Sequence, residues 1–191
     1  MLVDFYFGPG SRYSYLAATQ LDALARETSA EFRWRPLFSA DLIARTGGPR
    51  SPQDPDYRRT DVERWARLHG VPFHEPDGSS DWRRLALACV AADALGAVEP
   101  FSRALFAALY GQGKRIDDHV LADVAVATGL DAALLLAGVE SETVATAYAR
   151  NLSDALAVGA WGVPTFVTPD GELFWGQDRL PLLRDHLLSA A

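Results

Sequence analysis

The sequence predicts an α/β fold made of a βαβ unit, a long helical insertion and a final ββα unit. Three observations support this prediction. An aromatic strand pattern is followed by a glycine-rich break and a helical pattern, the middle of the chain is dominated by helical patterns, and two short strand patterns lie near the end. With 191 residues, 49% of them hydrophobic, the chain is long enough for one compact domain that carries an inserted subdomain.

The first unit reads as strand, helix, strand. Leu2–Phe7 is apolar and aromatic, and Gly8-Pro9-Gly10 ends this run. Ser11 is a candidate N-cap for a helix that continues to about Arg26. Glu31–Leu37 alternates between apolar and charged residues and predicts a second strand, so the connection is a parallel crossover.

The middle of the chain is predicted to be helical after a loop. Ser39–Pro55 is rich in Gly, Pro, Ser and Asp and is expected to be a loop. Apolar residues at helical spacing follow, punctuated by glycines, until Gly159–Gly162. The predicted helices are Tyr57–His69, Asp81–Leu95, Pro100–Tyr110, Asp118–Thr128 and Ser141–Val158.

The last unit is predicted as two strands and a helix. Val163–Thr168 and Leu173–Trp175 read as strands joined by a hairpin turn at Pro169–Glu172, and Arg179–Leu188 reads as the closing helix. This order of elements is the thioredoxin arrangement with an α-helical subdomain in its middle. We therefore divide the chain into a thioredoxin-like N-terminal part, a helical insertion and a thioredoxin-like C-terminal part, at residues 1–55, 56–158 and 159–191.

Composition excludes several classes of function. The formal net charge is −7 and no basic block is present, which disfavours nucleic acid and anionic membrane surfaces as partners. The lone Cys89 cannot form an internal disulfide and reads as an inert buried thiol, and the four histidines are too scattered for a zinc motif. The N-terminus lacks a signal-peptide pattern and no segment is apolar enough to span a membrane, so we expect a cytoplasmic protein without a metal.

The strand–helix junction at Ser11 is the first candidate site. A glycine-rich turn there exposes backbone N–H groups at a helix N-terminus, which favours anions, and a hydroxyl can donate a hydrogen bond to a thiolate or an oxyanion. The structural alternative is an ordinary N-cap serine.

Two further candidates have structural alternatives of their own. Pro164 precedes a strand and is either a cis proline that presents the backbone of Val163 or a trans proline at the start of the strand. Asp178 either caps the last helix and also accepts a hydrogen bond from a ligand ammonium group, or it only caps the helix and forms a surface ion pair.

The aromatic residues of the insertion allow two interpretations as well. Trp65, Phe73 and Trp82 are candidates for the wall of an aromatic substrate pocket, but aromatics in helical runs are more often core residues.

Together these segments resemble the 2-hydroxychromene-2-carboxylate isomerase family, relatives of kappa-class glutathione transferases and of DsbA-like thioredoxin-fold proteins. The similarity runs over nearly the whole chain, in family order. The matching stretches are Asp4–Phe7 with Ser11–Ala17, Asp61–Ala66, Gly70–Phe73, Gly159–Phe166 and Phe174–Leu180.

The resemblance implies roles for particular residues. Ser11 stands where the family keeps a catalytic serine that is hydrogen-bonded to the sulfur of glutathione, its cofactor. Val163, before a cis Pro164, is implied to pair its backbone with the cysteinyl unit. Gln177 and Asp178 are implied to hold the γ-glutamyl end, with Asp178 on the ammonium group. The resemblance also implies a homodimer and a small aromatic carboxylate as substrate.

The chain departs from the family pattern on the glycyl side of glutathione. Relatives commonly have proline after the serine, where this chain has Arg12, which adds a positive charge that favours a thiolate or binds a carboxylate. The usual asparagine and lysine contacts have no counterpart between Gly47 and Asp56. The candidates left for the glycyl carboxylate are Arg50, Arg58, Arg59 and Arg83.

Three alternatives to the isomerase remain open. A kappa-like transferase would use the same thiolate and release the adduct. A thiol–disulfide oxidoreductase needs a redox cysteine at the start of the first helix, where Ser11-Arg12-Tyr13-Ser14 offers only hydroxyls. A DsbA-like, non-redox binding protein would keep the fold without the chemistry.

Overall fold

A four-stranded sheet with the strand order β2-β1-β3-β4 forms the centre of the molecule. The computed structural model describes residues 1–48 and 55–190. Strand β1 (Leu2–Phe7) is parallel to β2 (Glu31–Pro36) and antiparallel to β3 (Thr165–Val167), and β3 is antiparallel to β4 (Leu173–Trp175). The predicted βαβ and ββα units are therefore confirmed, and they join in one sheet through β1 and β3.

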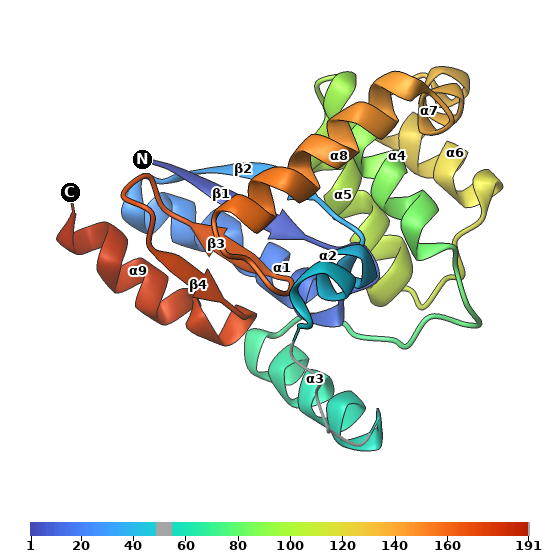
Figure 1. The fold of residues 1–191 in the computed structure, drawn as a ribbon. Helices are drawn as coiled ribbons and strands as arrows, with labels where there is room; N and C mark the ends of the chain where they lie inside the picture. Colours follow the sequence, from blue (N-terminus) through green and yellow to red (C-terminus); the bar gives the residue numbers. More distant parts are fainter. Residues whose placement is uncertain (49–54, 191) are drawn as a thin grey trace.

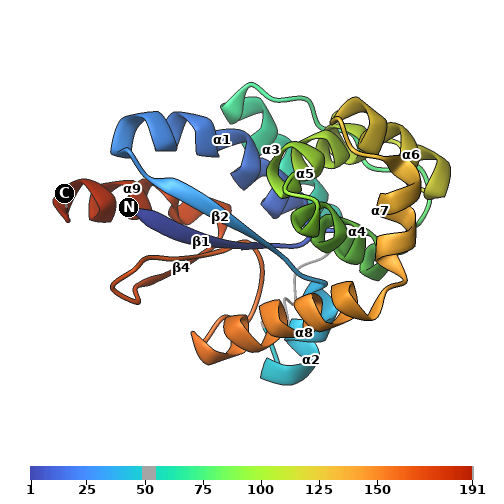
Figure 2. The ribbon, with the colours of Figure 1, turned by 90° about the horizontal axis from the view of Figure 1, so that it is seen from above.

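Helices cover both faces of this sheet. Helix α1 (Arg12–Thr28) contacts α9 (Leu180–Ser189) on one face, and α8 (Glu142–Ala157) contacts α2 (Ser39–Thr46) on the other. Figure 1 shows the sheet between these layers, and Figure 2 shows α1 on the opposite side of the strands from α8 and α2. The start of α1, the end of β1 and the start of β3 therefore lie at the same side of the sheet.

The side chains of β1 alternate between the two layers, as the period of a strand requires. Phe5 and Phe7 are fully buried in the core that includes Leu16 of α1, whereas Tyr6 is buried on the other side with Leu152 of α8. Burial on both faces explains why Leu2–Phe7 is almost uninterruptedly apolar.

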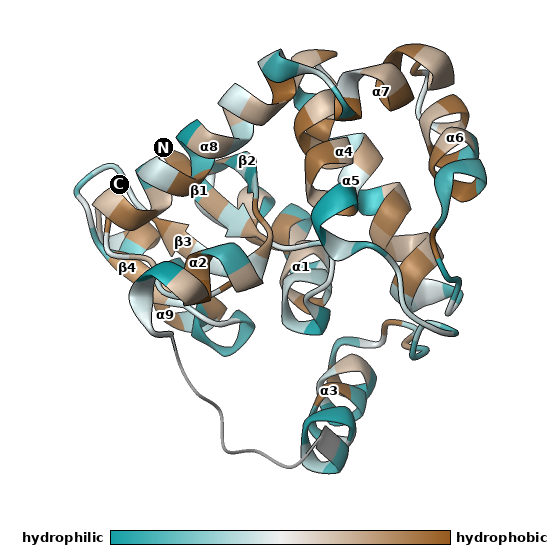
Figure 3. Cartoon of the chain, turned by 45° about the vertical axis from the view of Figure 1, so that its right-hand side comes forward, coloured by the Kyte–Doolittle hydropathy of each residue, from teal (hydrophilic) through white to brown (hydrophobic). Residues whose placement is uncertain are grey.

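The insertion between β2 and β3 is a group of helices. Its elements after α2 are α3 (Pro55–His69), α4 (Trp82–Ala94), α5 (Val98–Phe106), a π-helical turn (Ala107–Gly111), α6 (Asp118–Ala127), α7 (Ala132–Val139) and α8. Hydrophobic residues dominate α4, α5 and α7, whereas α3 is largely hydrophilic and lies below the other helices (Figure 3). Helix α3 packs against α1.

Between β2 and β3, one prediction was wrong and one helix was missed. Ser39–Pro55 was expected to be a loop, but Ser39–Thr46 forms α2, with Leu42 buried and Gly47 at its C-cap in the left-handed region, where glycine is favoured. Residues 49–54 of that expected loop lie outside the described residues. Helix α7 was missed because Ala132–Val139 is almost continuously apolar and shows no helical period; Asp131 caps it by accepting from the Leu134 amide.

The remaining predicted elements are confirmed with small changes at their ends. The expected helix Pro100–Tyr110 is divided into α5 and the π-helical turn. The expected strand Val163–Thr168 is reduced to Thr165–Val167, and the Val163–Pro164 peptide bond before it is cis. Among the described residues, none of the helices combines the length and the apolar character that crossing a membrane requires.

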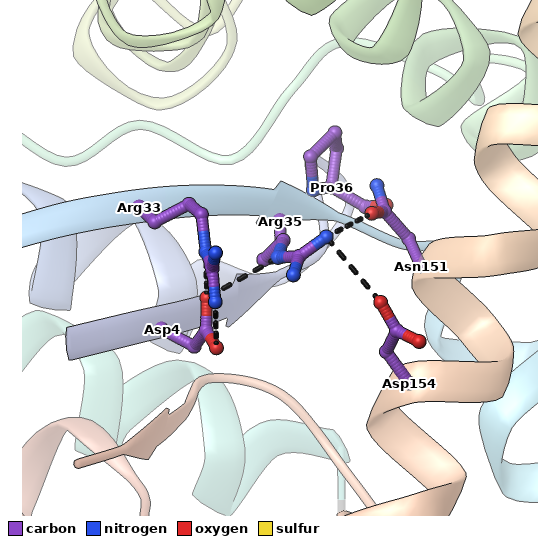
Figure 4. Close-up of polar contacts among 6 residues, drawn as sticks. All are labelled: Asp4, Arg33, Arg35, Pro36, Asn151 and Asp154. Carbon is purple, nitrogen blue, oxygen red and sulfur yellow. Dashed lines mark hydrogen bonds and ion pairs between the residues drawn. The ribbon is translucent and has the colours of Figure 1, made fainter. Parts of the chain in front are cut away.

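A polar network anchors α8 to the sheet (Figure 4). Asp4 of β1 lies opposite Arg33 of β2 and is hydrogen-bonded to it, and Arg35 Nε lies 3.2 Å from Asp4 Oδ1. Arg35 also donates to Asn151 Oδ1 at 3.1 Å and lies 3.5 Å from Asp154 of α8. Burial alone would raise the pKa of Asp4, but its hydrogen bonds from the two arginines outweigh this and keep the pKa below its usual value.

Candidate functional site

A cavity of about 770 Å³ lies where the start of α1, helix α3, the cis-proline segment and the turn after β4 meet. These elements converge below the sheet in Figure 1. The residues predicted for the site line this cavity together: Ser11, Arg12, Val163, Pro164, Gln177 and Asp178. They come from the two ends of the chain, so only the folded sheet brings them together.

Ser11 is the N-cap of α1 and lines the cavity. Its backbone is extended, with φ −99° and ψ 114°, and its Oγ accepts a hydrogen bond from the Ser14 amide at 3.1 Å. The structural alternative, an ordinary cap, is thus present. The capping bond uses Oγ as an acceptor, however, so the hydroxyl hydrogen remains available to a ligand. No acidic residue occupies the first turn of α1, which preserves the positive end of its dipole.

Glycines allow the close packing around Ser11. A Cβ on Gly8 would lie 3.2 Å from Val163 Cγ2, and a Cβ on Gly10 would lie 2.9 Å from Trp82 Cε3. The first contact brings the β1–α1 turn against the cis-proline segment. The Gly-Pro-Gly break in the sequence therefore leaves room for the side chains of Val163 and Trp82 as well as forming a turn.

Arg12 lines the cavity, but its charge is already matched. Its guanidinium is paired with Glu75, with Nε 2.9 Å from Oε2 and 3.1 Å from Oε1. This hydrogen bonding raises the pKa of Arg12 above its usual value. The prediction that the positive charge of Arg12 favours a thiolate or binds a carboxylate stays a prediction, and the ion pair with Glu75 offsets part of that charge.

The cis-proline segment lies beyond the end of the sheet. The β1–β3 ladder ends at the pair Tyr6 and Thr165, so Val163 lies past the last ladder pair. The Gly176 amide donates to the Pro164 carbonyl at 2.9 Å, which connects this segment to the turn after β4. The cis bond, implied by the resemblance, is present, and the backbone of Val163 lies at the cavity wall.

The turn after β4 is shaped by Gly176. Its φ of 114° is in the region that favours glycine, and a Cβ there would lie 2.3 Å from Asp178 Oδ1. Asp178 Oδ2 lies 3.0 Å from Arg179 Nη1. The expectation that Asp178 caps the last helix is wrong, because residues 177–179 form a 3₁₀ turn and α9 begins at Leu180 without a side-chain cap.

Gln177 is the most buried polar residue of this turn, with 3% of its surface exposed. Its Oε1 lies 3.2 Å from Nε2 of His69, the last residue of α3. Its Nε2 is buried and, within the described ranges, has no hydrogen-bond acceptor. A buried donor without a partner is uncommon in native proteins and marks a position that a ligand can satisfy.

Helix α3 contributes a second wall. Arg58, Asp61, Val62 and Trp65 line the cavity from this helix. The Tyr13 hydroxyl donates to Asp61 Oδ2 at 2.8 Å, and burial together with this bond raises the pKa of Tyr13, so that it stays a neutral phenol.

Arg58 differs from the other arginines considered for the glycyl carboxylate. It lines the cavity, its Nε is buried without an acceptor, and it forms no ion pair within residues 1–48 and 55–190. Arg59 pairs with Asp56, Arg83 pairs with Asp41, and Arg50 lies outside the described residues. Of the described candidates, Arg58 is therefore the one that can meet an anion in the cavity.

The aromatic candidates divide between wall and core. Trp65 lines the cavity, whereas Phe73 packs with Tyr110, their ring centroids 6.0 Å apart. Trp82 lies against Gly10 rather than in the lining. Sequence reasoning missed Trp175, which lines the cavity. The ring centroids of Trp175 and Trp161 lie 5.7 Å apart, and both residues are more than a third exposed.

Sequence reasoning also missed His69 and the role of Tyr13 with Asp61. The His69–Gln177 contact joins residues 108 positions apart, and the Tyr13–Asp61 bond joins residues 48 positions apart. No local pattern signals either pair. Asp61 and Tyr13 lie in the stretches that carry the family resemblance, which is the one signal that could have indicated them.

The described lining of the cavity contains no cysteine. Cys89 is in α4, completely buried, and burial raises the pKa of its thiol to about 12. It is therefore an inert core thiol, as predicted. In the part of the chain that the structure describes, no cluster of three or more His, Cys, Asp or Glu side chains could hold a metal ion.

Comparison with known proteins agrees with this architecture. The DSBA-like thioredoxin domain family matches residues 2–188. A 2-hydroxychromene-2-carboxylate isomerase of Sphingobium xenophagum is 34% identical, with 97% of each chain covered. The structure of a 2-hydroxychromene-2-carboxylate isomerase superposes with a TM-score of 0.87 at 28% identity, covering 98% of this chain and 94% of that one.

A more distant structure shares the fold. The cytosolic disulfide reductase DsbM of Pseudomonas aeruginosa, solved with GSH, has a TM-score of 0.70 at 23% identity, covering 99% of this chain and 96% of that one. The full-length matches to named isomerases decide the assignment at the level of the family. The chain belongs to the 2-hydroxychromene-2-carboxylate isomerases, a family of enzymes within the DSBA-like thioredoxin domain proteins.

Proposed function

We propose that this protein is a glutathione-dependent isomerase of the 2-hydroxychromene-2-carboxylate isomerase type. The observation that carries the proposal is the position of Ser11. Its hydroxyl lies at the N-terminus of α1, in a cavity shared with the cis-proline segment and the Gly176–Arg179 turn. The isomerases to which the chain is similar give the reaction type.

The lining fits the three parts of glutathione. Ser11 and the start of α1 supply a donor and a positive dipole end for the thiol. The backbone of Val163 is available to the cysteinyl unit, as in strand addition. Gln177 and Asp178 face the γ-glutamyl end, and Arg58, the cation without an ion pair in the described part of the lining, receives the glycyl carboxylate or the substrate carboxylate.

In this proposal the protein ionises a thiol and orients an aromatic substrate. Glutathione, held by Ser11, Val163, Gln177 and Asp178, would supply a nucleophilic thiolate for reversible addition to an enone and would be regenerated in the isomerisation. The Ser11 hydroxyl stabilises the thiolate by donating to sulfur. Trp65 and Trp175 provide apolar surface for the aromatic ring, and the neutral Tyr13 hydroxyl remains hydrogen-bonded to Asp61.

Turnover of 2-hydroxychromene-2-carboxylate with and without glutathione tests the proposal. We expect isomerisation that requires glutathione and regenerates it. Undiminished turnover without the thiol would refute the glutathione dependence. A thioether that accumulates would instead identify a kappa-like transferase, and no binding of glutathione by calorimetry would identify a non-enzymatic binding protein.

We also propose a cytoplasmic homodimer. The isomerase type implies this assembly. Sedimentation equilibrium of the full chain tests it; a single species of monomer mass at micromolar concentration would contradict it.

A further inference from the structure

The polar contact between His69 and Gln177 connects two walls of the cavity. His69 ends α3, which supplies Arg58, Asp61 and Trp65 to the lining, and Gln177 opens the turn after β4. In Figure 1 the C-terminal end of α3 lies beside the segment that leads into α9. The 3.2 Å contact between His69 Nε2 and Gln177 Oε1 therefore joins the helix to the turn.

The two ends of the Gln177 carboxamide are in different situations. Oε1 is a pure acceptor, so at 3.2 Å it takes the hydrogen of an imidazole N–H. Nε2 is a pure donor; it is buried and has no acceptor in the described part of the chain. One end of a side chain that is 3% exposed is thus satisfied by the protein, while the other end is not.

The imidazole itself is held in place. Its ring stacks on Trp65, with centroids 5.6 Å apart and planes at 26°. His69 is absent from the lining of the cavity, whereas Trp65 and Gln177 are part of it. His69 therefore acts on a ligand only through Gln177 and Trp65.

We propose that His69 is a positioning residue. It fixes the Gln177 carboxamide with the oxygen toward the imidazole, so that the amide nitrogen is kept as a donor for the carboxylate of the γ-glutamyl end of glutathione. The terminal torsion of glutamine is broad, so the carboxamide can tilt slightly when a ligand oxygen arrives. This inference rests on the proposed function because it takes glutathione as the ligand.

The inference separates the two charged groups of the γ-glutamyl end. A carboxylate only accepts hydrogen bonds and needs the donor end of Gln177, whereas an ammonium group only donates and would need the oxygen. Without His69 the orientation of the Gln177 carboxamide is no longer fixed. Its oxygen can then turn to the ligand, where it would repel a carboxylate. The loss should therefore depend on the ligand carboxylate and not on the ligand amine.

Calorimetry with glutathione and two analogues tests this directly. Glutaryl-Cys-Gly keeps the carboxylate and lacks the amine, and 4-aminobutyryl-Cys-Gly keeps the amine and lacks the carboxylate. We expect His69→Ala to weaken glutathione and glutaryl-Cys-Gly about tenfold, the size of one hydrogen bond to a charged group. The amine analogue should bind His69→Ala and the unaltered protein equally, and turnover at saturating glutathione should stay within about twofold.

Two sets of variants separate positioning from a structural effect. His119→Ala removes an imidazole on α6 that is 85% exposed and should leave all three affinities unchanged. In a Gln177→Ala background, His69→Ala should cause no further loss, because His69 acts through Gln177. An equal loss for the amine analogue, or an undiminished effect in the Gln177→Ala background, would overturn the inference.

The imidazole tautomer gives a readout that does not depend on any ligand. Long-range ¹⁵N–¹H spectra of the unaltered protein should show His69 with its proton on Nε2. A proton on Nδ1 alone would make Nε2 an acceptor, reverse the carboxamide and overturn the inference. Failure of the unaltered protein to bind glutathione would contradict the proposed function, whereas normal binding that His69→Ala leaves unchanged would contradict this inference alone.

Discussion

The Ser11 Oγ atom accepts a hydrogen bond from the Ser14 amide at 3.1 Å, so one oxygen both caps α1 and lines the cavity. Ser14 Oγ in turn accepts from the Gly8 amide at 3.3 Å, which ties the β1–α1 turn to the helix. The observed capping role and the proposed chemical role therefore fall on one side chain, Ser11, and we expect a substitution there to affect both. Experiments on Ser11 need controls that separate the cap from the hydroxyl.

Ser11→Ala should reduce glutathione-dependent turnover about 100-fold, because a preorganised donor to a developing anion is lost. It should also cost about 1 kcal/mol of stability through the lost cap. Ser141→Ala removes the cap of α8, where Oγ accepts from the Val144 amide at 3.2 Å and also donates to the Gly138 carbonyl at 2.7 Å. Denaturant unfolding and steady-state kinetics should give a stability loss at least as large for Ser141→Ala, with normal turnover. Equal turnover in the two variants would show that the Ser11 hydroxyl has no chemical role.

Arg58→Gln should weaken binding of a carboxylate ligand about 10- to 100-fold, because a charge-assisted hydrogen bond is lost. Calorimetry with glutathione and its glycyl ethyl ester distinguishes the two carboxylates. If Arg58 receives the glycyl carboxylate, the ester should bind both proteins equally; if it receives the substrate carboxylate, only KM for the substrate should rise. Arg59→Gln is the matched control, since Arg59 is exposed and paired with Asp56. Unchanged affinity and KM in Arg58→Gln would exclude Arg58 from ligand binding.

Gly176→Ala should lower glutathione affinity about tenfold or more. The added Cβ would lie 2.3 Å from Asp178 Oδ1, and the φ of 114° disfavours any side chain, so the turn that carries Gln177 must shift. Gly171→Ala is the control, because Gly171 has φ 89° and open space around its Cα. Both variants should lose about 1 kcal/mol of stability from backbone strain. Equal glutathione affinities of the two variants, measured by calorimetry, would show that this turn has no role in binding glutathione.

Asp4→Asn should destabilise the protein at neutral pH by about 2 kcal/mol, through hydrogen bonds to charged arginines. The folded pKa of Asp4 lies below the ordinary 3.8, so its ionised form stabilises the fold above that value. This contribution is lost as the pH falls through the folded pKa, so the two proteins should converge in stability well below pH 3.8. Urea unfolding at several pH values checks this, with Asp185→Asn at an exposed ion pair as the control. A stability difference that persists at the lowest pH would contradict the assignment.

The strands and most helices could be predicted because burial and helix caps leave patterns in neighbouring residues of the sequence. The aromatic run Leu2–Phe7 is buried on both faces, and Ser11 has the features of an N-cap. Helix α2 was missed because it is short, has no side-chain cap at Phe38 and is followed by Gly47 and Gly48. Helix α7 was missed because its residues are apolar on nearly every side.

The site was predictable in part, because Ser11, Pro164 and Gln177 lie in distinctive segments at the two ends of the chain. The pairing of Arg12 with Glu75 was not predictable, since it depends on how the segment before α4 folds back on the start of α1. The His69–Gln177 contact has the same origin in tertiary packing. Sequence therefore predicted residues that the structure brings to one cavity, while the structure alone revealed which of their charges are already matched.

The position of the glutathione sulfur in a crystal decides whether Ser11 has the proposed role. A crystal of the protein soaked with glutathione should place Sγ about 3 to 3.5 Å from Ser11 Oγ, within reach of a hydrogen bond to sulfur. We expect that distance, with the cysteinyl backbone beside Val163. A sulfur bound elsewhere, or a cavity that glutathione at saturating concentration does not enter, would contradict it.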